Sequence, residues 1–143
     1  MRALLDVNVL IALLDAAHSA HTAARAWLSQ NIDEGWASCP ITQNGLVRIM
    51  SQSGYPHAIS PTQAAALLRD ATATGYHQFW ADDVSLLDPQ RFDTTRLHGA
   101  RQITDAYLLA LAVKRRGRFV TFDSAVPTGA VPSASDRNLV VLR

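Results

Sequence analysis

The stretch RALLDVNVLIALLD, residues 2–15, carries a carboxylate, Asp6, inside an otherwise apolar run. Its first part, RALLD, has the composition of a short strand that is buried on both faces of a parallel sheet. Helical spacing of the apolar residues follows at once, and Asn8 is well placed to cap that helix. An ionised carboxylate taken out of water costs several kcal/mol unless it is paired. Asp6 therefore either faces solvent at the end of a strand or meets a cation there.

The composition describes one globular domain, 1–143. With 48% hydrophobic and 17% charged residues, the chain is long enough and apolar enough to bury a core. The net charge is only +1, which gives no overall signal for nucleic-acid binding. The single cysteine, Cys39, excludes an intrachain disulfide and favours a reducing compartment, with the thiol buried. No apolar run reaches the ~20 residues of a membrane span, so we expect a cytoplasmic protein.

Strand and helix patterns alternate along the whole chain. Helices are expected over residues 20–30, 42–52, 61–73 and 104–117, the last with Gly117 as its C-cap. Short strands are expected over residues 35–40, 76–81, 118–123 and 138–143. This alternation predicts an α/β fold, a three-layer α/β/α sandwich around a mainly parallel sheet.

Three aspartates fall at one predicted edge of that sheet. Asp6 and Asp123 end two of the strands, and Asp105 lies in the first turn of the helix that opens near Thr104. In open parallel sheets the functional crevice lies beyond the carboxyl ends of the strands. Three carboxylates that close repel one another unless a cation neutralises them, and oxygen ligands select hard cations such as Mg²⁺ or Mn²⁺. Such a site is suited to hydrolysis of a phosphodiester.

Each aspartate alone also has a plainer interpretation as a helix cap, a helix-dipole partner or an Asx turn. The coincidence of all three at one edge favours a site. His18 and His21 have i, i+3 spacing but no third ligand nearby, so they do not predict a zinc centre. The sequence contains neither a G-x-S-x-G elbow nor a phosphate-binding G-x-x-x-x-G-K loop.

Four segments together resemble the PIN-domain ribonucleases, and specifically the VapC toxins of type II toxin–antitoxin modules: LLDVNVLIAL, CPITQNGLVRIM, ITDAYLLALA and FVTFD. The resemblance runs nearly end to end, so residues 1–143 are expected to form a single PIN domain. It implies a Mg²⁺- or Mn²⁺-dependent endoribonuclease that cuts RNA, commonly tRNA or rRNA. It also implies a homodimer and a VapB-type antitoxin that wraps the toxin and pushes a C-terminal segment into the active site.

The resemblance assigns metal binding to Asp6, Asp105 and Asp123, of which the last often supports metal or water less directly. Asn8 matches a polar residue two places after the first aspartate, and we expect it to contact metal-bound groups or substrate. Thr104, directly before Asp105, is expected to be a second supporting polar group.

Gln43 is the one departure from the family pattern, which usually has a glutamate there. No carboxylate lies between Glu34 and Asp70 to replace it. An amide keeps an oxygen that can coordinate or orient water but removes one charge. We therefore expect Gln43 to complete the catalytic site with weaker metal binding and one well-held ion. Two roles are open for Arg48, namely binding RNA phosphate or pairing with an aspartate inside the domain.

Two other functions stay open at this point. Gln43 motivates an inactive PIN-like RNA-binding module, against which retained metal binding would argue. A receiver-like phosphoryl acceptor would need a lysine near a strand-end aspartate, and the only lysine, Lys114, is poorly placed. The apolar runs VLIALL and YLLALAV are compatible with a dimer face and an antitoxin groove, and a thick core explains them nearly as well.

Overall fold

A single parallel sheet lies at the centre of the molecule, and the computed structural model describes all residues from 1 to 143. The strand order is β3-β2-β1-β4-β5, and every neighbouring pair is parallel. The strands are β1 (Ala3–Leu5), β2 (Trp36–Ser38), β3 (His77–Phe79), β4 (Arg118–Thr121) and β5 (Leu139–Val141). The predicted α/β class is confirmed, and the sheet is parallel throughout.

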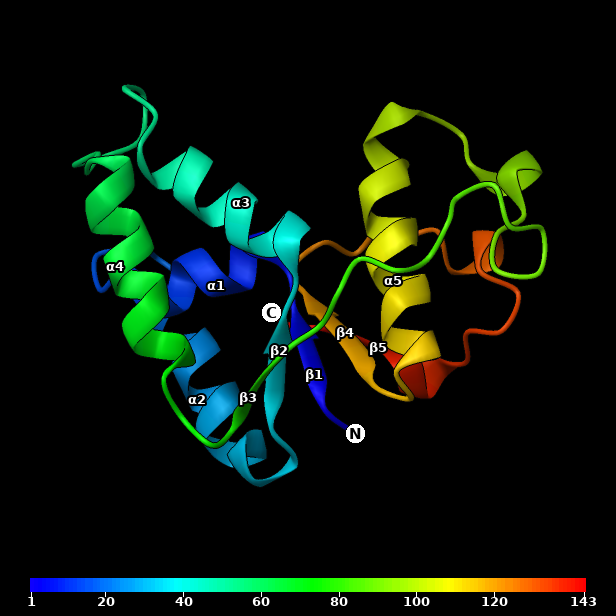
Figure 1. Cartoon of the computed structure of the whole chain (residues 1–143), viewed down its shortest axis with the longest axis horizontal. Helices are drawn as coiled ribbons and strands as arrows, with labels where there is room; N and C mark the ends of the chain where they lie inside the picture. Colours follow the sequence, from blue (N-terminus) through cyan, green and yellow to red (C-terminus); the bar gives the residue numbers. More distant parts are fainter.

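Helices cover both faces of this sheet. They are α1 (Val7–Leu14), α2 (His21–Asn31), α3 (Pro40–Met50), α4 (Pro61–Thr72) and α5 (Ile103–Lys114). Figure 1 shows α1 to α4 on one side of the strands and α5 on the other, with the long connection before α5 wrapped around that helix. This is the predicted three-layer sandwich. None of the five α-helices combines the length and apolar character that crossing a bilayer requires.

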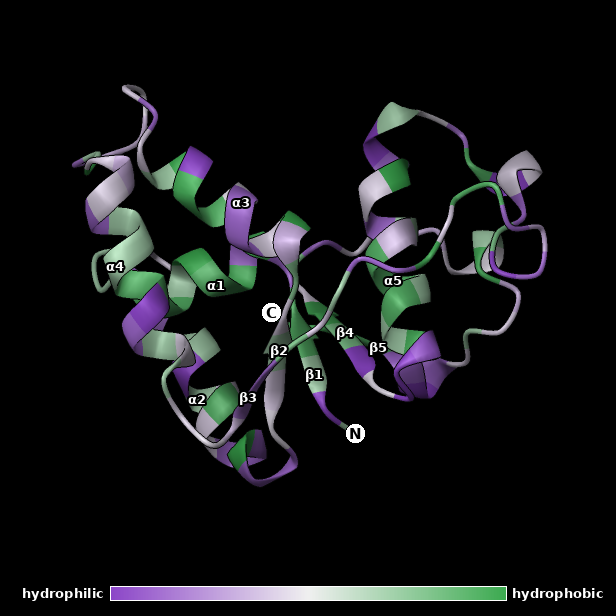
Figure 2. Ribbon diagram, in the orientation of Figure 1, coloured by the Kyte–Doolittle hydropathy of each residue, from purple (hydrophilic) through white to green (hydrophobic).

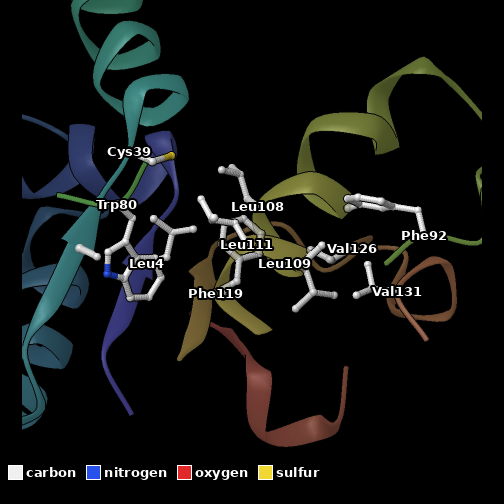
Figure 3. Close-up of a cluster of buried hydrophobic side chains, with 14 residues drawn as sticks. Leu4, Cys39, Trp80, Phe92, Leu108, Leu109, Leu111, Phe119, Val126 and Val131 are labelled. Atoms are coloured by element: carbon white, nitrogen blue, oxygen red, sulfur yellow. The ribbon is translucent and has the colours of Figure 1, made fainter. Parts of the chain in front are cut away.

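The alternation of side chains along the strands builds two separate cores. Leu4 and Phe119 face α5, whereas Leu5 and Val120 face the layer of α1 to α4. Figure 3 shows the first cluster, in which Leu108 and Leu111 of α5 meet the sheet residues. Figure 2 shows the hydrophobic residues concentrated on the central strands, α1 and α5.

The apolar runs VLIALL and YLLALAV are both largely buried within the single chain. Helix α1 buries residues 9–12, and α5 buries Ala106 and residues 108–112. A thick monomer core therefore accounts for these runs, and they supply no separate argument for a dimer face. Cys39 is fully buried, and burial raises the pKa of its thiol to about 11, as expected for a structural cysteine.

The strand order places the functional crevice at one junction. From β1 the chain proceeds outward through β2 to β3 on one side, and it later adds β4 and β5 on the other. The carboxyl ends of β1 and β4 therefore meet at the switch point of the sheet, where open α/β proteins form their binding crevices. Asp6 follows β1 directly, and Asp123 lies two residues beyond β4.

The ends of two helices differ from the sequence prediction. Asp6, not Asn8, is the N-cap of α1, because its side chain accepts the Val7 N–H. Helix α3 begins at Pro40 rather than Thr42, since proline suits the first helical turn. Thr42 instead closes a capping box with Cys39.

Gly117 does not cap α5, because the left-handed residue at that end is Arg116, with φ of 56°. Gly117 allows a close approach instead, since a Cβ there would lie 2.6 Å from the Arg2 carbonyl oxygen and 2.8 Å from the Trp80 ring. We expect Gly117→Ala to lower the free energy of unfolding by about 1–3 kcal/mol. Gly75→Ala, with no atom within 4 Å, is the matched control in urea denaturation, and equal losses in both variants would contradict this account.

Candidate metal centre

A cavity of about 450 Å³ opens at the carboxyl ends of β1 and β4. It brings together the three aspartates that the sequence singled out, from three separate parts of the chain. Its polar lining consists of Asp6, Asn8, His18, Tyr55, Arg101, Asp105 and Asp123. Three apolar residues, Val7, Ile11 and Ile49, complete the wall. The predicted convergence of Asp6, Asp105, Asp123 and Asn8 is therefore present in the structure.

Asp6 is held rigidly at the junction of β1 and α1. One carboxylate oxygen accepts the Val7 N–H at 2.7 Å, and the other accepts the Thr121 hydroxyl at 2.6 Å. The residue is only 8% exposed, and burial raises the pKa of its carboxyl group. The two hydrogen bonds lower that pKa, while the charge of Asp123 raises it further. Asp6 is thus a buried acid whose charge is only partly compensated within the chain.

Thr121, the last residue of β4, connects three of the site residues. Its fully buried hydroxyl donates to Asp6 and accepts the Asp123 N–H at 3.0 Å. It also accepts from the Asn8 side-chain amide at 3.3 Å, while the Asn8 oxygen accepts the Phe122 N–H at 3.3 Å. Asn8 therefore ties the start of α1 to the end of β4. Sequence reasoning missed Thr121, although its place two residues before Asp123 was a usable signal.

Among the carboxyl groups of the molecule, that of Asp105 has the most strongly raised pKa. Burial raises the pKa of its carboxyl group to about 7 from 3.8, with further contributions from a hydrogen bond with Asp123 and from the charges of Asp6 and Asp123. Asp123 also accepts the Ala125 N–H at 2.8 Å, in the Asx turn that was the plainer interpretation of this residue. The three carboxyl groups are therefore close enough to oppose one another's ionisation.

The donor set fits a hard divalent cation. Three carboxylates supply oxygen ligands, and the charge that burial penalises is the charge that such a cation neutralises. No group of three or more His, Cys, Asp or Glu side chains is arranged so that it could hold a metal ion. Binding of a cation by all three aspartates would therefore require their side chains to rearrange around it.

The structure does not place Gln43 in the acidic cavity, contrary to the sequence prediction. Its side-chain amide donates to the Ser38 hydroxyl at 3.0 Å, and that hydroxyl lies 2.8 Å from Nε2 of His77. Gln43 instead lines a neighbouring pocket with Asn44 and Arg69. The physical reason is the buried Ser38 hydroxyl, whose bond to the amide turns the side chain toward β2.

Thr104 and Arg48 also lie outside the cavity lining. Both are exposed, and the Thr104 hydroxyl forms no hydrogen bond in the structure. Arg48 forms no ion pair, so the internal pairing considered for it is not observed. Lys114 pairs with Asp83 at 3.2 Å and is likewise absent from the cavity, which removes the lysine that a phosphoryl-acceptor site would need.

Three polar residues of the cavity were not predicted from the sequence. Arg101 lies four residues before Asp105, and this helical spacing could have indicated a shared face. His18 lies between α1 and α2, and Tyr55 lies between α3 and α4. Their arrival at the cavity depends on loop geometry, for which the sequence carries no periodic signal.

Comparison with known proteins gives a family match and several similar chains. The family described as PIN domain matches residues 3–128. Ribonuclease VapC44 of Mycobacterium tuberculosis is 57% identical over 142 residues, which cover 99% of this chain and 100% of the relative. Ribonuclease VapC38 of the same organism is 46% identical over 127 residues, or 88% of each chain.

Two solved structures share the fold. VapBC2 from Rickettsia felis, bound to a DNA fragment from their promoter, aligns over 100% of both chains with a TM-score of 0.66 and 12% identity. Mycobacterium tuberculosis VapC20, described as a sarcin–ricin loop cleaving toxin, covers 92% of this chain and 98% of its own, with a TM-score of 0.61 and 15% identity. The family match over most of the length and the end-to-end relative show that the chain belongs to the PIN domain family and, within it, to the VapC ribonucleases.

Proposed function

We propose that the chain is a Mg²⁺- or Mn²⁺-dependent endoribonuclease and the toxin of a type II toxin–antitoxin module. The observation that carries the proposal is the convergence of Asp6, Asp105 and Asp123 on one cavity, with the pKa of Asp105 raised to about 7. Folding places these carboxylates together at a cost that no basic partner offsets. A divalent cation would offset it, and the VapC relatives are named as ribonucleases.

In this proposal Asp6 and Asp105 are the principal metal ligands, and Asp123 completes the set. A bound divalent cation supplies activation of water and stabilisation of negative charge on the phosphate. Asp6 is oriented by Val7 and Thr121, so its position is set before any ligand binds. Asn8 joins the start of α1 to the end of β4 through its bonds with Thr121 and Phe122.

The substrate we propose is structured RNA such as tRNA or rRNA. Its phosphodiester would enter the cavity, where Arg101 is the only arginine or lysine of the lining. Arg48 is exposed on α3 and is proposed to contact RNA phosphate outside the cavity. Supporting this substrate class, one of the structural relatives is named for cleaving the sarcin–ricin loop.

The partners we propose are a VapB-type antitoxin and a second copy of the chain. One structural relative is a VapBC assembly, and an antitoxin segment in the acidic cavity would block access to it. A cytoplasmic location agrees with the single buried cysteine. Light scattering of the purified chain tests the homodimer directly.

Metal titration is the first test of this function. We expect Mn²⁺ binding in calorimetry to the wild type, and a loss of about 10-fold or more in affinity for Asp6→Asn. Gln43→Glu should bind Mn²⁺ more tightly once its side chain turns from Ser38 toward the aspartates, because a carboxylate adds a negative charge that the amide lacks. Asp70→Asn, an exposed residue of α4, is the control. A wild type that binds neither Mn²⁺ nor Mg²⁺, with no gain in Gln43→Glu, would contradict the catalytic proposal.

Cleavage of bacterial total RNA is the second test. Wild-type protein with Mg²⁺ should create new 5′ ends at defined positions, and EDTA should abolish them. Mapping those ends by sequencing identifies the target as tRNA, rRNA or another RNA. RNA binding without cleavage and without metal binding would instead support a PIN-like RNA-binding module, the alternative that Gln43 motivates.

A further inference from the structure

The loop between α1 and α2 carries an imidazole into the acidic cavity. His18 lies in this loop and lines the cavity together with Asp6, Asp105 and Asp123. It is the only histidine in the lining. The nuclease chemistry described above assigns it no role.

The loop is fixed to the cavity wall by hydrogen bonds. The Tyr55 hydroxyl donates to the Asp15 carboxylate, which also accepts the Ala17 N–H at 3.0 Å. The His18 N–H donates to the Asp15 carbonyl oxygen at 3.0 Å, and His21 N–H donates to the His18 carbonyl oxygen at 3.0 Å. His18 is therefore held in place before any ligand binds, by a tyrosine that itself lines the cavity.

The hydrogen bond made by the His18 ring fixes its tautomer. Nδ1 accepts the Ala20 N–H at 3.0 Å, so this nitrogen carries no proton. The neutral ring must then carry its proton on Nε2, which has no partner within the chain. The loop thus presents the Nε2 edge of the His18 ring as a hydrogen-bond donor.

Few other donors in the cavity are free. The Asn8 amide already donates to Thr121, and the Tyr55 hydroxyl donates to Asp15. The aspartates are acceptors when ionised. Nε2 of His18, the exposed guanidinium of Arg101 and the second N–H of the Asn8 amide are left to meet an anionic ligand.

We propose that the Nε2–H of His18 donates a hydrogen bond to a non-bridging phosphate oxygen of RNA in the acidic cavity, which makes His18 a substrate-binding residue. This inference rests on the proposed nuclease function and deepens it. The carboxylates would hold a divalent cation, and His18 and Arg101 would supply the N–H donors to the phosphate that carboxylates cannot. Tyr55 is a positioning residue, since it acts on the substrate only through Asp15 and the loop.

The test compares His18→Ala with His18→Gln, whose amide can place an N–H near the Nε2 position. Bacterial total RNA is the cleavage substrate, and calorimetry with Mn²⁺ monitors the metal site. We expect His18→Ala to slow cleavage about 10- to 100-fold, and His18→Gln to recover most of that loss. Mn²⁺ affinity should be unchanged in both. His57→Gln, an exposed histidine without a side-chain hydrogen bond, is the matched control.

Long-range ¹H–¹⁵N correlation of the histidine rings tests the tautomer without any RNA. We expect the Nε2–H form for His18 in the free protein, and an Nδ1–H form would overturn the inference. Equal cleavage by wild type and His18→Ala, or a His18→Gln variant as slow as His18→Ala, would also overturn it and leave the nuclease function standing. A wild type that neither binds Mn²⁺ nor cleaves RNA would overturn both.

Discussion

Asp105→Asn is expected to abolish RNA cleavage and, at the same time, to make the metal-free protein more stable at pH 8. Loss of one of three carboxylate ligands should reduce the cleavage rate by about 10²-fold or more, comparable to removal of an essential electrostatic group in other active sites. The gain in stability follows because burial and two neighbouring aspartates oppose ionisation of this carboxyl group. Asparagine has a similar shape and carries no charge.

The pH dependence of this effect follows from the direction of the shift. The folded protein holds the Asp105 proton up to about pH 7, whereas the unfolded chain releases it near 3.8. The stabilisation from the protonated form is therefore complete below pH 3.8 and is lost as the pH rises to 7. At pH 8 the wild type carries the full penalty, which we place at about 1–2 kcal/mol after allowance for solvent screening of a half-buried group.

Urea denaturation in EDTA at pH 4 and pH 8 measures this penalty. The difference in unfolding free energy between Asp105→Asn and wild type should grow from pH 4 to pH 8. Asp70→Asn, which removes an exposed charge on α4, should show no such growth. With saturating Mn²⁺ the wild type should become more stable than Asp105→Asn, because only the wild type gains the full free energy of metal binding. If Asp105→Asn is less stable than wild type at pH 8 in EDTA, the three carboxylates do not destabilise the metal-free fold by mutual repulsion.

The architecture could be predicted because its signals are local. Two-sided burial of β1 reads directly from RALL, and α5 reads from an almost unbroken apolar run that ends in basic residues. The details at helix ends could not be predicted in the same way. Asp6 caps α1 because β1 ends directly before it, and Gly117 is needed because Arg2 and Trp80 approach it. The Gly117 contacts join distant parts of the chain, which no local pattern in the sequence indicates.

The residues of the candidate site likewise fall into those that local patterns predict and those that depend on long-range contacts. The three aspartates could be predicted because each marks the end of an element, and parallel topology brings those ends together. Thr121 and Asp6 are separated by 115 positions in the sequence, and Tyr55 and Asp15 by 40. Gln43 is the opposite case. The sequence pattern predicts it in the site, but its side chain bonds to Ser38 instead.

Thr121→Val is expected to have the largest effect on stability of any substitution considered for the site. Valine keeps the shape of threonine but has no hydroxyl, so three hydrogen bonds are lost at a fully buried position. The Asp123 N–H and one Asp6 carboxylate oxygen lose their partner. An unpaired buried polar group costs about 1–3 kcal/mol, so we expect a loss of about 3 kcal/mol or more in the free energy of unfolding.

Thr121→Ser is the matched control, because it removes a methyl group and keeps the hydroxyl. It should lose about 1 kcal/mol from the missing methyl group and retain Mn²⁺ binding close to wild type. In Thr121→Val the pKa of Asp6 should rise further, since the Thr121 hydrogen bond is the larger of the two that lower it against burial. Mn²⁺ affinity should then fall more steeply in Thr121→Val than in wild type as the pH is lowered from 8 to 6. If valine and serine behave alike in both measurements, Thr121 contributes packing alone, and Asp6 must be held in position by Val7 and the strand itself.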